Sequence, residues 1–200
     1  RIGHGKSSAL KEIRTIRYLE DEGKDFLPRV IQQLGLKQPL IIYGHSDGGT
    51  IALIYAASFP ENVLAVISEA AHVFNEPETR NGILKMIGEY EAGDLPVKLQ
   101  KFHGEKTRTM FYAWAMPWLT PRAEKWNIFN YLNDIQTKTL IVQGMQDPYA
   151  TIKQVNEIKS RLRDKAVTVQ FDQCGHSPHS EQKELVIEKT VEFLMPFCKL

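Results

Sequence analysis

Residues 39–50 read Pro-Leu-Ile-Ile-Tyr-Gly-His-Ser-Asp-Gly-Gly-Thr. An apolar run stops at a glycine, and Ser46 follows in the pattern Gly-x-Ser-x-Gly, with Gly44 and Gly48 in the fixed positions. This spacing is typical of a serine on a sharp strand-to-helix turn, where side chains at the two glycine positions would collide with neighbouring backbone. The turn places the hydroxyl beside a helix N-terminus, whose N–H groups favour developing negative charge. The pattern therefore predicts that Ser46 is a nucleophile.

Other apolar runs have the length and composition of buried strands. The run Leu40–Tyr43 is followed by similar runs at residues 63–67, 139–142 and 167–171. We expect the strand at Leu40–Tyr43 to be buried on both faces. Helical periodicity marks residues 18–36, 51–59, 152–162 and 186–197. Strands that alternate with helices predict an α/β protein with a parallel sheet wrapped by helices.

The segment from residue 71 to residue 134 breaks this alternation. It is too long for a simple connection, and its glycines and prolines divide it into several helices. It contains all three tryptophans, Trp114, Trp118 and Trp126. These rings indicate either a lid over an apolar site or the segment's own core. We expect core residues 1–70, a helical lid insertion at 71–134 and core residues 135–200, with Trp114 and Trp118 at the substrate.

Composition excludes several function classes. The chain has 200 residues, of which 42% are hydrophobic and 24% charged, as in an ordinary globular domain. Its formal net charge of +1 does not point to nucleic acid or to an anionic membrane surface. It contains no apolar run of the roughly 20 residues that span a bilayer. We expect a cytoplasmic protein whose two cysteines, Cys174 and Cys198, are reduced.

A serine nucleophile needs a base within hydrogen-bond reach, and the base needs an acid that holds its tautomer. Functional loops of a parallel sheet gather at the carboxyl ends of its strands. Asp147 follows the third predicted strand and His176 follows the fourth. Ser46, Asp147 and His176 therefore form a candidate catalytic triad.

Each partner of the serine has competitors. Glu69 follows the second predicted strand and is an alternative acid. His179 and His72 are alternative bases, although His176 stands in the favoured loop directly after a glycine.

At these residues the chain resembles the α/β-hydrolase superfamily over nearly its whole length. The order serine, aspartate, histidine matches that superfamily, and the loop Gly3-His4-Gly5-Lys6-Ser7 is similar to the loop after its fourth strand. The Ser-Asp-Gly-Gly elbow and the Gly-His-Ser-Pro-His ending look most similar to small lidded serine esterases, including the valacyclovir hydrolase-like branch.

The resemblance implies a role for each site residue. Ser46 would be the nucleophile, His176 the base and Asp147 the acid. The backbone N–H of Asp47 would form half of the oxyanion hole. The side chain of Asp47 would either favour the helix N-terminus or bind a cationic group of the substrate. No metal or organic cofactor is implied.

The resemblance also concerns the region before residue 1. Family members supply the second oxyanion N–H and their first strands from there. We expect the natural polypeptide to be longer than this chain. The chain alone would then expose an open sheet edge at residues 40–43 and be poorly soluble or inactive.

The expected function is hydrolysis of a small ester or related acyl bond through an acyl-enzyme, with a small-molecule substrate as the partner. Carbon–carbon bond hydrolysis or amide hydrolysis would use a similar triad. A noncatalytic protein that binds a ligand on the same fold is the alternative from another class. A third alternative is nucleotide binding, because Gly5-Lys6-Ser7 ends like a phosphate-binding loop.

Overall fold

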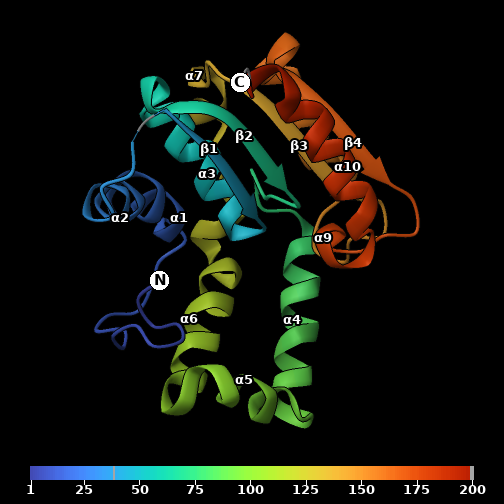
Figure 1. Cartoon of the computed structure of the whole chain (residues 1–200). Helices are drawn as coiled ribbons and strands as arrows, with labels where there is room; N and C mark the ends of the chain where they lie inside the picture. Colours follow the sequence, from blue (N-terminus) through green and yellow to red (C-terminus); the bar gives the residue numbers. More distant parts are fainter. Residues whose placement is uncertain (38, 199–200) are drawn as a thin grey trace. The chain divides into compact units, whose positions relative to one another are not determined.

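The computed structural model describes residues 1–37 and 39–198, which fall into two compact units (Figure 1). The core unit comprises Leu19–Phe74 and Asn127–Leu200. The helical unit comprises Arg1–Tyr18 and Asn75–Trp126. Residues 1–18, which the sequence predicts to belong to the core, are thus grouped with the helical segment.

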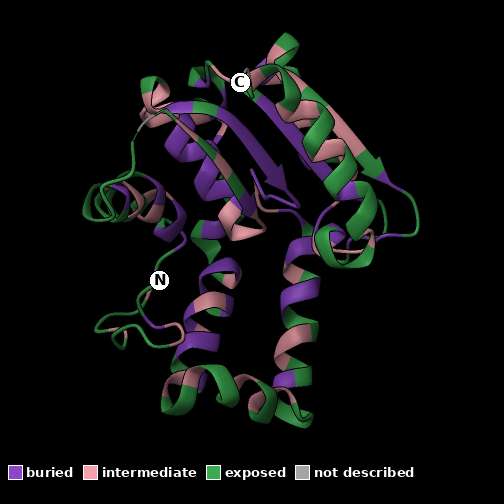
Figure 2. Cartoon of the chain, in the orientation of Figure 1, coloured by how far each residue is buried: buried purple, intermediate pink, exposed green. Residues whose placement is uncertain are grey.

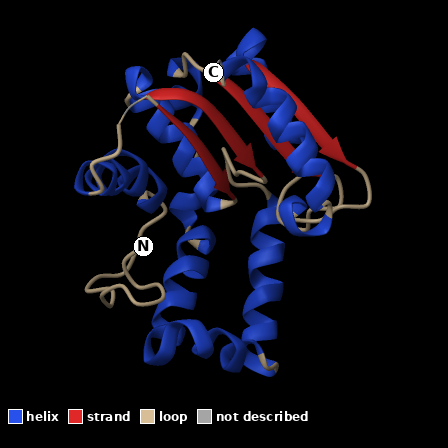
Figure 3. Cartoon of the chain, viewed as in Figure 1, coloured by secondary structure: helices blue, strands red, loops and turns tan. Residues whose placement is uncertain are grey.

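The core unit contains a four-stranded sheet (Figure 3). The strands are β1 (Leu40–His45), β2 (Val63–Glu69), β3 (Lys138–Gly144) and β4 (Ala166–Phe171). They lie in the order β1-β2-β3-β4, and each neighbouring pair is parallel. The predicted α/β class with a parallel sheet is confirmed. Since all four strands run the same way, Ser46, Glu69 and the loops after β3 and β4 emerge at one edge of the sheet.

Helices cover both faces of this sheet. The helical segments are α1 (Tyr18–Asp21), the π-helical η1 (Glu22–Phe26), α2 (Leu27–Gln33), α3 (Asp47–Ser58), η2 (Pro60–Asn62), α7 (Phe129–Asp134), α8 (Ile152–Leu162), η5 (Arg163–Lys165), α9 (Pro178–Glu181), α10 (Lys183–Leu194) and η6 (Met195–Phe197). Helix α3 packs on β1 and β2 and is buried along most of its length (Figure 2). On the other face, Val186 and Phe193 of α10 pack against Ile67, Leu140 and Val142.

Strand β1 is less buried than its apolar composition predicts. Ile41 and Tyr43 are 39% and 45% exposed, so the expectation of burial on both faces is wrong. The cause is position, because β1 lies at the end of the sheet and, among the described residues, pairs only with β2. Val30 and Leu34 of the predicted amphipathic helix are also exposed.

The helical unit consists of α4 (Pro77–Ala92), α5 (Leu95–His103), η3 (Gly104–Lys106), α6 (Thr107–Leu119) and η4 (Pro121–Lys125), together with an N-terminal loop. Lys106 Nζ donates to the carbonyl oxygens of Gly5 and Ser7, which ties this loop to the helices. Residues 1–17 contain no helix. A phosphate-binding loop opens a helix directly after its Lys-Ser pair, so the structure does not support the nucleotide-binding alternative. None of the helices described here is long and apolar enough to cross a bilayer.

Candidate active site

Ser46 lies on a strained turn between β1 and α3. Its backbone has φ 56° and ψ −121°, a left-handed conformation that L-residues rarely adopt. Its N–H donates to the carbonyl oxygen of Glu69 at 2.8 Å, and its own carbonyl accepts from the N–H of Thr50 at 3.1 Å. These bonds hold the serine at the junction of β1, β2 and α3.

The two glycines that flank the serine do not have the same role. A Cβ at Gly44 would collide with the backbone of Gly48 and Gly49. Among the described residues, a Cβ at Gly48 would meet nothing within 4 Å apart from its chain neighbours and the backbone of its own helix. The predicted steric requirement therefore holds at Gly44 and is wrong at Gly48.

His176 connects the serine to the aspartate. Its Nε2 lies 2.9 Å from Ser46 Oγ, and its Nδ1 lies 2.8 Å from Asp147 Oδ2. Since a carboxylate only accepts, the proton of the neutral imidazole lies on Nδ1, and Nε2 accepts from the serine hydroxyl. The structure brings together the three residues that the strand-end argument selected.

Asp147 is held in its ionised form. Its side chain is fully buried, yet it accepts from the Tyr149 N–H and from Gln143 Nε2, both at 2.8 Å. Burial acts to raise the pKa of Asp147, but the bonds from His176, Tyr149 and Gln143 outweigh burial and leave that pKa below its ordinary value. A charged carboxylate can stabilise an imidazolium that forms on His176.

Two sets of contacts position the loop that carries His176. The loop approaches the end of β3 so closely that a Cβ at Gly144 would collide with the carbonyl oxygens of Cys174 and Gly175. Glu181 accepts from the N–H groups of Gly175 and Ser177 at 2.6 and 2.9 Å. No sequence motif marks Glu181 or Gln143, so neither is among the predicted site residues.

The competing acid and bases have other partners. Glu69 Oε1 accepts from His179 Nδ1 at 2.9 Å and not from His176. The ring of His72 is buried and bonds the carbonyl oxygen of Tyr149 through Nε2 at 3.1 Å. Asp147 is therefore the acid that contacts His176, while Glu69 and His179 form a separate pair.

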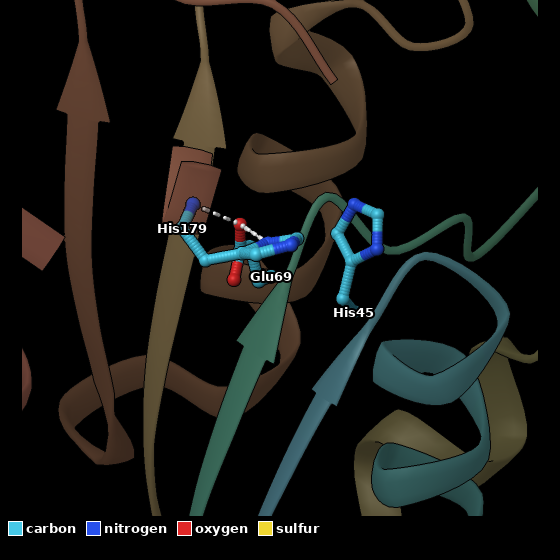
Figure 4. Close-up of side chains that lie close together, drawn as sticks. All are labelled: His45, Glu69 and His179. Atoms are coloured by element: carbon cyan, nitrogen blue, oxygen red, sulfur yellow. Dashed lines mark hydrogen bonds and ion pairs between the residues drawn. The ribbon is translucent and has the colours of Figure 1, made fainter. Parts of the chain in front are cut away.

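Together with His45, this separate pair forms the one group of described residues that has the composition of a metal site. Ligand atoms of His45, Glu69 and His179 lie within 4.8 Å of one another (Figure 4). They are already engaged with the protein: His45 Nε2 bonds the carbonyl oxygen of His176, and both Glu69 oxygens accept hydrogen bonds. A metal ion would have to displace these bonds.

Comparison with known proteins identifies the family. The family model of the alpha/beta hydrolase fold matches residues 1–114, more than half of the chain. The chain belongs to this family. A comparison with curated protein sequences found no match.

Solved structures of other α/β-hydrolases share the fold. A serine hydrolase involved in carbazole degradation (CarC enzyme) has a TM-score of 0.74 at 20% identity, over 97% of this chain and 76% of its own. A thermophilic esterase from Thermogutta terrifontis has a TM-score of 0.72 at 18% identity, over 98% and 77%. The enol-lactonase from Burkholderia xenovorans LB400 has a TM-score of 0.72 at 16% identity, over 97% and 78%.

The remaining predicted site residues lie in two places. Asp47 is the first residue of α3, directly after Ser46, where helix N–H groups point out along the axis. Trp114 and Trp118 belong to the helical unit. Trp118 is 2% exposed, and its Nε1 donates to Tyr18 Oη at 3.2 Å. Trp114 lines an apolar cavity of about 250 Å³ within that unit.

Proposed function

We propose that this α/β-hydrolase is a serine hydrolase that cleaves a small ester or a related acyl bond. The observation that carries the proposal is the chain of hydrogen bonds from Ser46 through His176 to Asp147, at 2.9 and 2.8 Å. Its geometry is that of a nucleophile, a base and an orienting acid.

The proposed reaction has two stages. His176 Nε2 takes the Ser46 hydroxyl proton while Oγ attacks the acyl carbonyl, and Asp147 stabilises the imidazolium. The Asp47 N–H donates to the oxyanion of the tetrahedral intermediate. His176 returns the proton to the leaving alcohol, and the acyl group stays on Ser46. Water, deprotonated by His176, then attacks the acyl-enzyme. His176 returns this proton to Ser46 Oγ as the acid leaves, which restores the free enzyme.

The substrate class is proposed from the surroundings of the serine. The partner is a small molecule rather than nucleic acid or membrane, no cofactor takes part, and the site of action is the cytoplasm. The Asp47 carboxylate follows the nucleophile directly and binds a cationic group. Asp47→Asn should therefore lower turnover of amino-acid esters more than turnover of neutral esters of equal size, and an equal loss on both would contradict this role.

Fluorophosphonate labelling, with the adduct mapped by mass spectrometry, tests the proposed function. We expect a label on Ser46 of the folded natural polypeptide, with none in Ser46→Ala and little in His176→Ala. A folded chain that takes no label would favour the alternative of a noncatalytic ligand-binding protein. If Ser46 is labelled, turnover of matched esters, amides and carbon–carbon substrates separates esterase activity from the other triad chemistries.

A further inference from the structure

Glu69 contacts both the loop of the proposed nucleophile and the loop of the proposed base. Its carbonyl oxygen accepts from the Ser46 N–H at 2.8 Å. Its carboxylate is fully buried, and Oε1 accepts from the backbone N–H and from Nδ1 of His179 at 2.8 and 2.9 Å. Oε2 accepts from Tyr43 Oη. Burial and this carboxylate raise the pKa of Tyr43, which keeps its hydroxyl a donor. One residue thus joins β1, β2 and the segment after His176.

His45 supports the same loop at its centre. Its Nε2 lies 2.7 Å from the carbonyl oxygen of His176, and because a carbonyl only accepts, Nε2 carries the proton. Burial lowers the pKa of His45, which favours the neutral form of the ring. Its ring centroid lies 4.9 Å from that of His176 and 4.7 Å from that of His179. Figure 4 shows the rings of His45 and His179 with Glu69.

Together these contacts hold the backbone of residues 175–179, the loop that carries His176, and we call this set of contacts the clamp. Glu181 holds the N–H groups of Gly175 and Ser177, His45 holds the carbonyl of His176, and Glu69 holds the N–H of His179. The direct bonds of the His176 ring go only to Ser46 and Asp147 among the described residues. The loop backbone must therefore help to set the distance between the His176 ring and Ser46 Oγ.

We propose that Glu69 and His45 are positioning residues, which hold His176 at hydrogen-bond distance from Ser46. The inference rests on the proposed function for its effect on turnover, but the placement of His176 can be measured without a reaction. A displacement of about 1 Å at a reacting group lowers a rate by about a hundredfold. Loss of the clamp should therefore lower kcat and leave KM nearly unchanged.

The test compares four variants in hydrolysis of p-nitrophenyl acetate. His45→Phe keeps an aromatic ring without a donor, and we expect kcat to fall about 10- to 100-fold with KM within about twofold. His45→Gln restores an N–H near the same place and should recover much of that loss. Glu69→Gln should lower kcat about tenfold, because a neutral amide holds His179 less strongly. Glu188→Gln, an exposed carboxylate on α10, is the matched control and should behave as the parent chain.

Proton NMR of the His176–Asp147 hydrogen bond gives a readout that is independent of activity. We expect its low-field imidazole proton to be present in the parent, in Glu188→Gln and in His45→Gln, and to be broadened or lost in His45→Phe. Parental kcat and an unchanged proton signal in a folded His45→Phe would overturn the inference. A parent without turnover or label, but with this pattern of signals, would overturn only the proposed function.

Thermal unfolding shows whether each variant is folded. If His45→Phe or Glu69→Gln does not fold, Tyr43→Phe replaces them, because it removes a single bond to Glu69 Oε2. We then expect a smaller loss of kcat at constant KM. A loss expressed in KM alone would contradict a positioning role.

Discussion

Two carboxylate–histidine pairs lie at the ends of neighbouring strands, and they differ in what the second ring nitrogen of each histidine meets. Asp147 and Glu69 are both fully buried, and each accepts from a histidine Nδ1, at 2.8 and 2.9 Å. The other ring nitrogen of His176, Nε2, faces Ser46 Oγ, and the His176 side chain is 19% exposed. The His179 side chain is 43% exposed, and among the described residues its ring hydrogen-bonds only to Glu69.

The comparison shows that an acid–base pair acquires its role from its neighbours. The chemistry of the two pairs is nearly the same, so neither residue type nor burial of the carboxylate distinguishes them. The serine turn after β1 does so, because it presents a hydroxyl to one histidine. The Glu69–His179 pair connects the turn at Ser46 to the loop that carries His176, and we propose that it holds the Asp147–His176 pair in position.

The largest predicted difference between the pairs is in turnover. Asp147→Asn should lower kcat about ten-thousandfold, because an amide donor at Nδ1 favours the wrong tautomer of His176. Glu69→Gln should cost only about tenfold, since Glu69 acts through the backbone of the loop. Steady-state kinetics on one small ester measures both. Equal losses would mean that the two pairs share the chemistry.

A second prediction concerns the close approach that places the Asp147–His176 pair. Gly144→Ala would push its Cβ into the carbonyl oxygens of Cys174 and Gly175 and should destabilise the fold by about 1–3 kcal/mol. Gly48→Ala is the matched control, because its Cβ meets open space. Urea unfolding of both variants checks the difference. Equal stability would show that the loop after β4 is free to move.

The third prediction is a pH dependence of stability that involves Asp147. Its pKa in the folded state is below its value in the unfolded chain, which is about 3.9. Its ionisation therefore stabilises the fold fully above about pH 4, and this contribution is lost as the pH falls through the lower folded pKa. Unfolding midpoints measured from about pH 6 downward should fall less steeply in Asp147→Asn than in the parent. Parallel curves would contradict this.

The smallest predicted effect is that of removing metal ions. Since His179 and Tyr43 already satisfy the Glu69 carboxylate, and His45 bonds the carbonyl oxygen of His176, treatment with EDTA should leave kcat and the unfolding temperature unchanged. Dialysis into metal-free buffer, followed by addition of zinc, checks this. A loss on chelation that zinc reverses would show that His45, Glu69 and His179 hold an ion.

The sequence predicts the sheet and the triad candidates because each depends on local signals. Apolar runs gave the four strands, the Gly-x-Ser-x-Gly spacing gave the turn at Ser46, and positions after strands gave Asp147 and His176. Position along the chain could not decide between Asp147 and Glu69, because both follow strands. The three-dimensional structure distinguishes them, because the Asp147 carboxylate lies within hydrogen-bond distance of His176, whereas the Glu69 carboxylate bonds His179.

Other features lie outside what local signals contain. The exposure of Ile41 follows from the place of β1 in the sheet, which no residue of β1 encodes. The clamp by Glu181 and the bond from Gln143 depend on the path of the loop after β4. Gly48 matches the pattern without a steric need in this structure, so a motif position does not by itself establish a packing requirement.

The backbone conformation of Ser46 has opposite effects on the proposed activity and on stability. A left-handed backbone at a non-glycine residue costs on the order of 1–3 kcal/mol, and the bonds to Glu69 and Thr50 hold the serine there. Glycine would adopt the same φ without that strain, yet it has no hydroxyl to offer. Ser46→Gly would therefore relieve this strain and at the same time remove the proposed nucleophile. Selection for thermostability alone would therefore act against the residue that the proposed reaction needs.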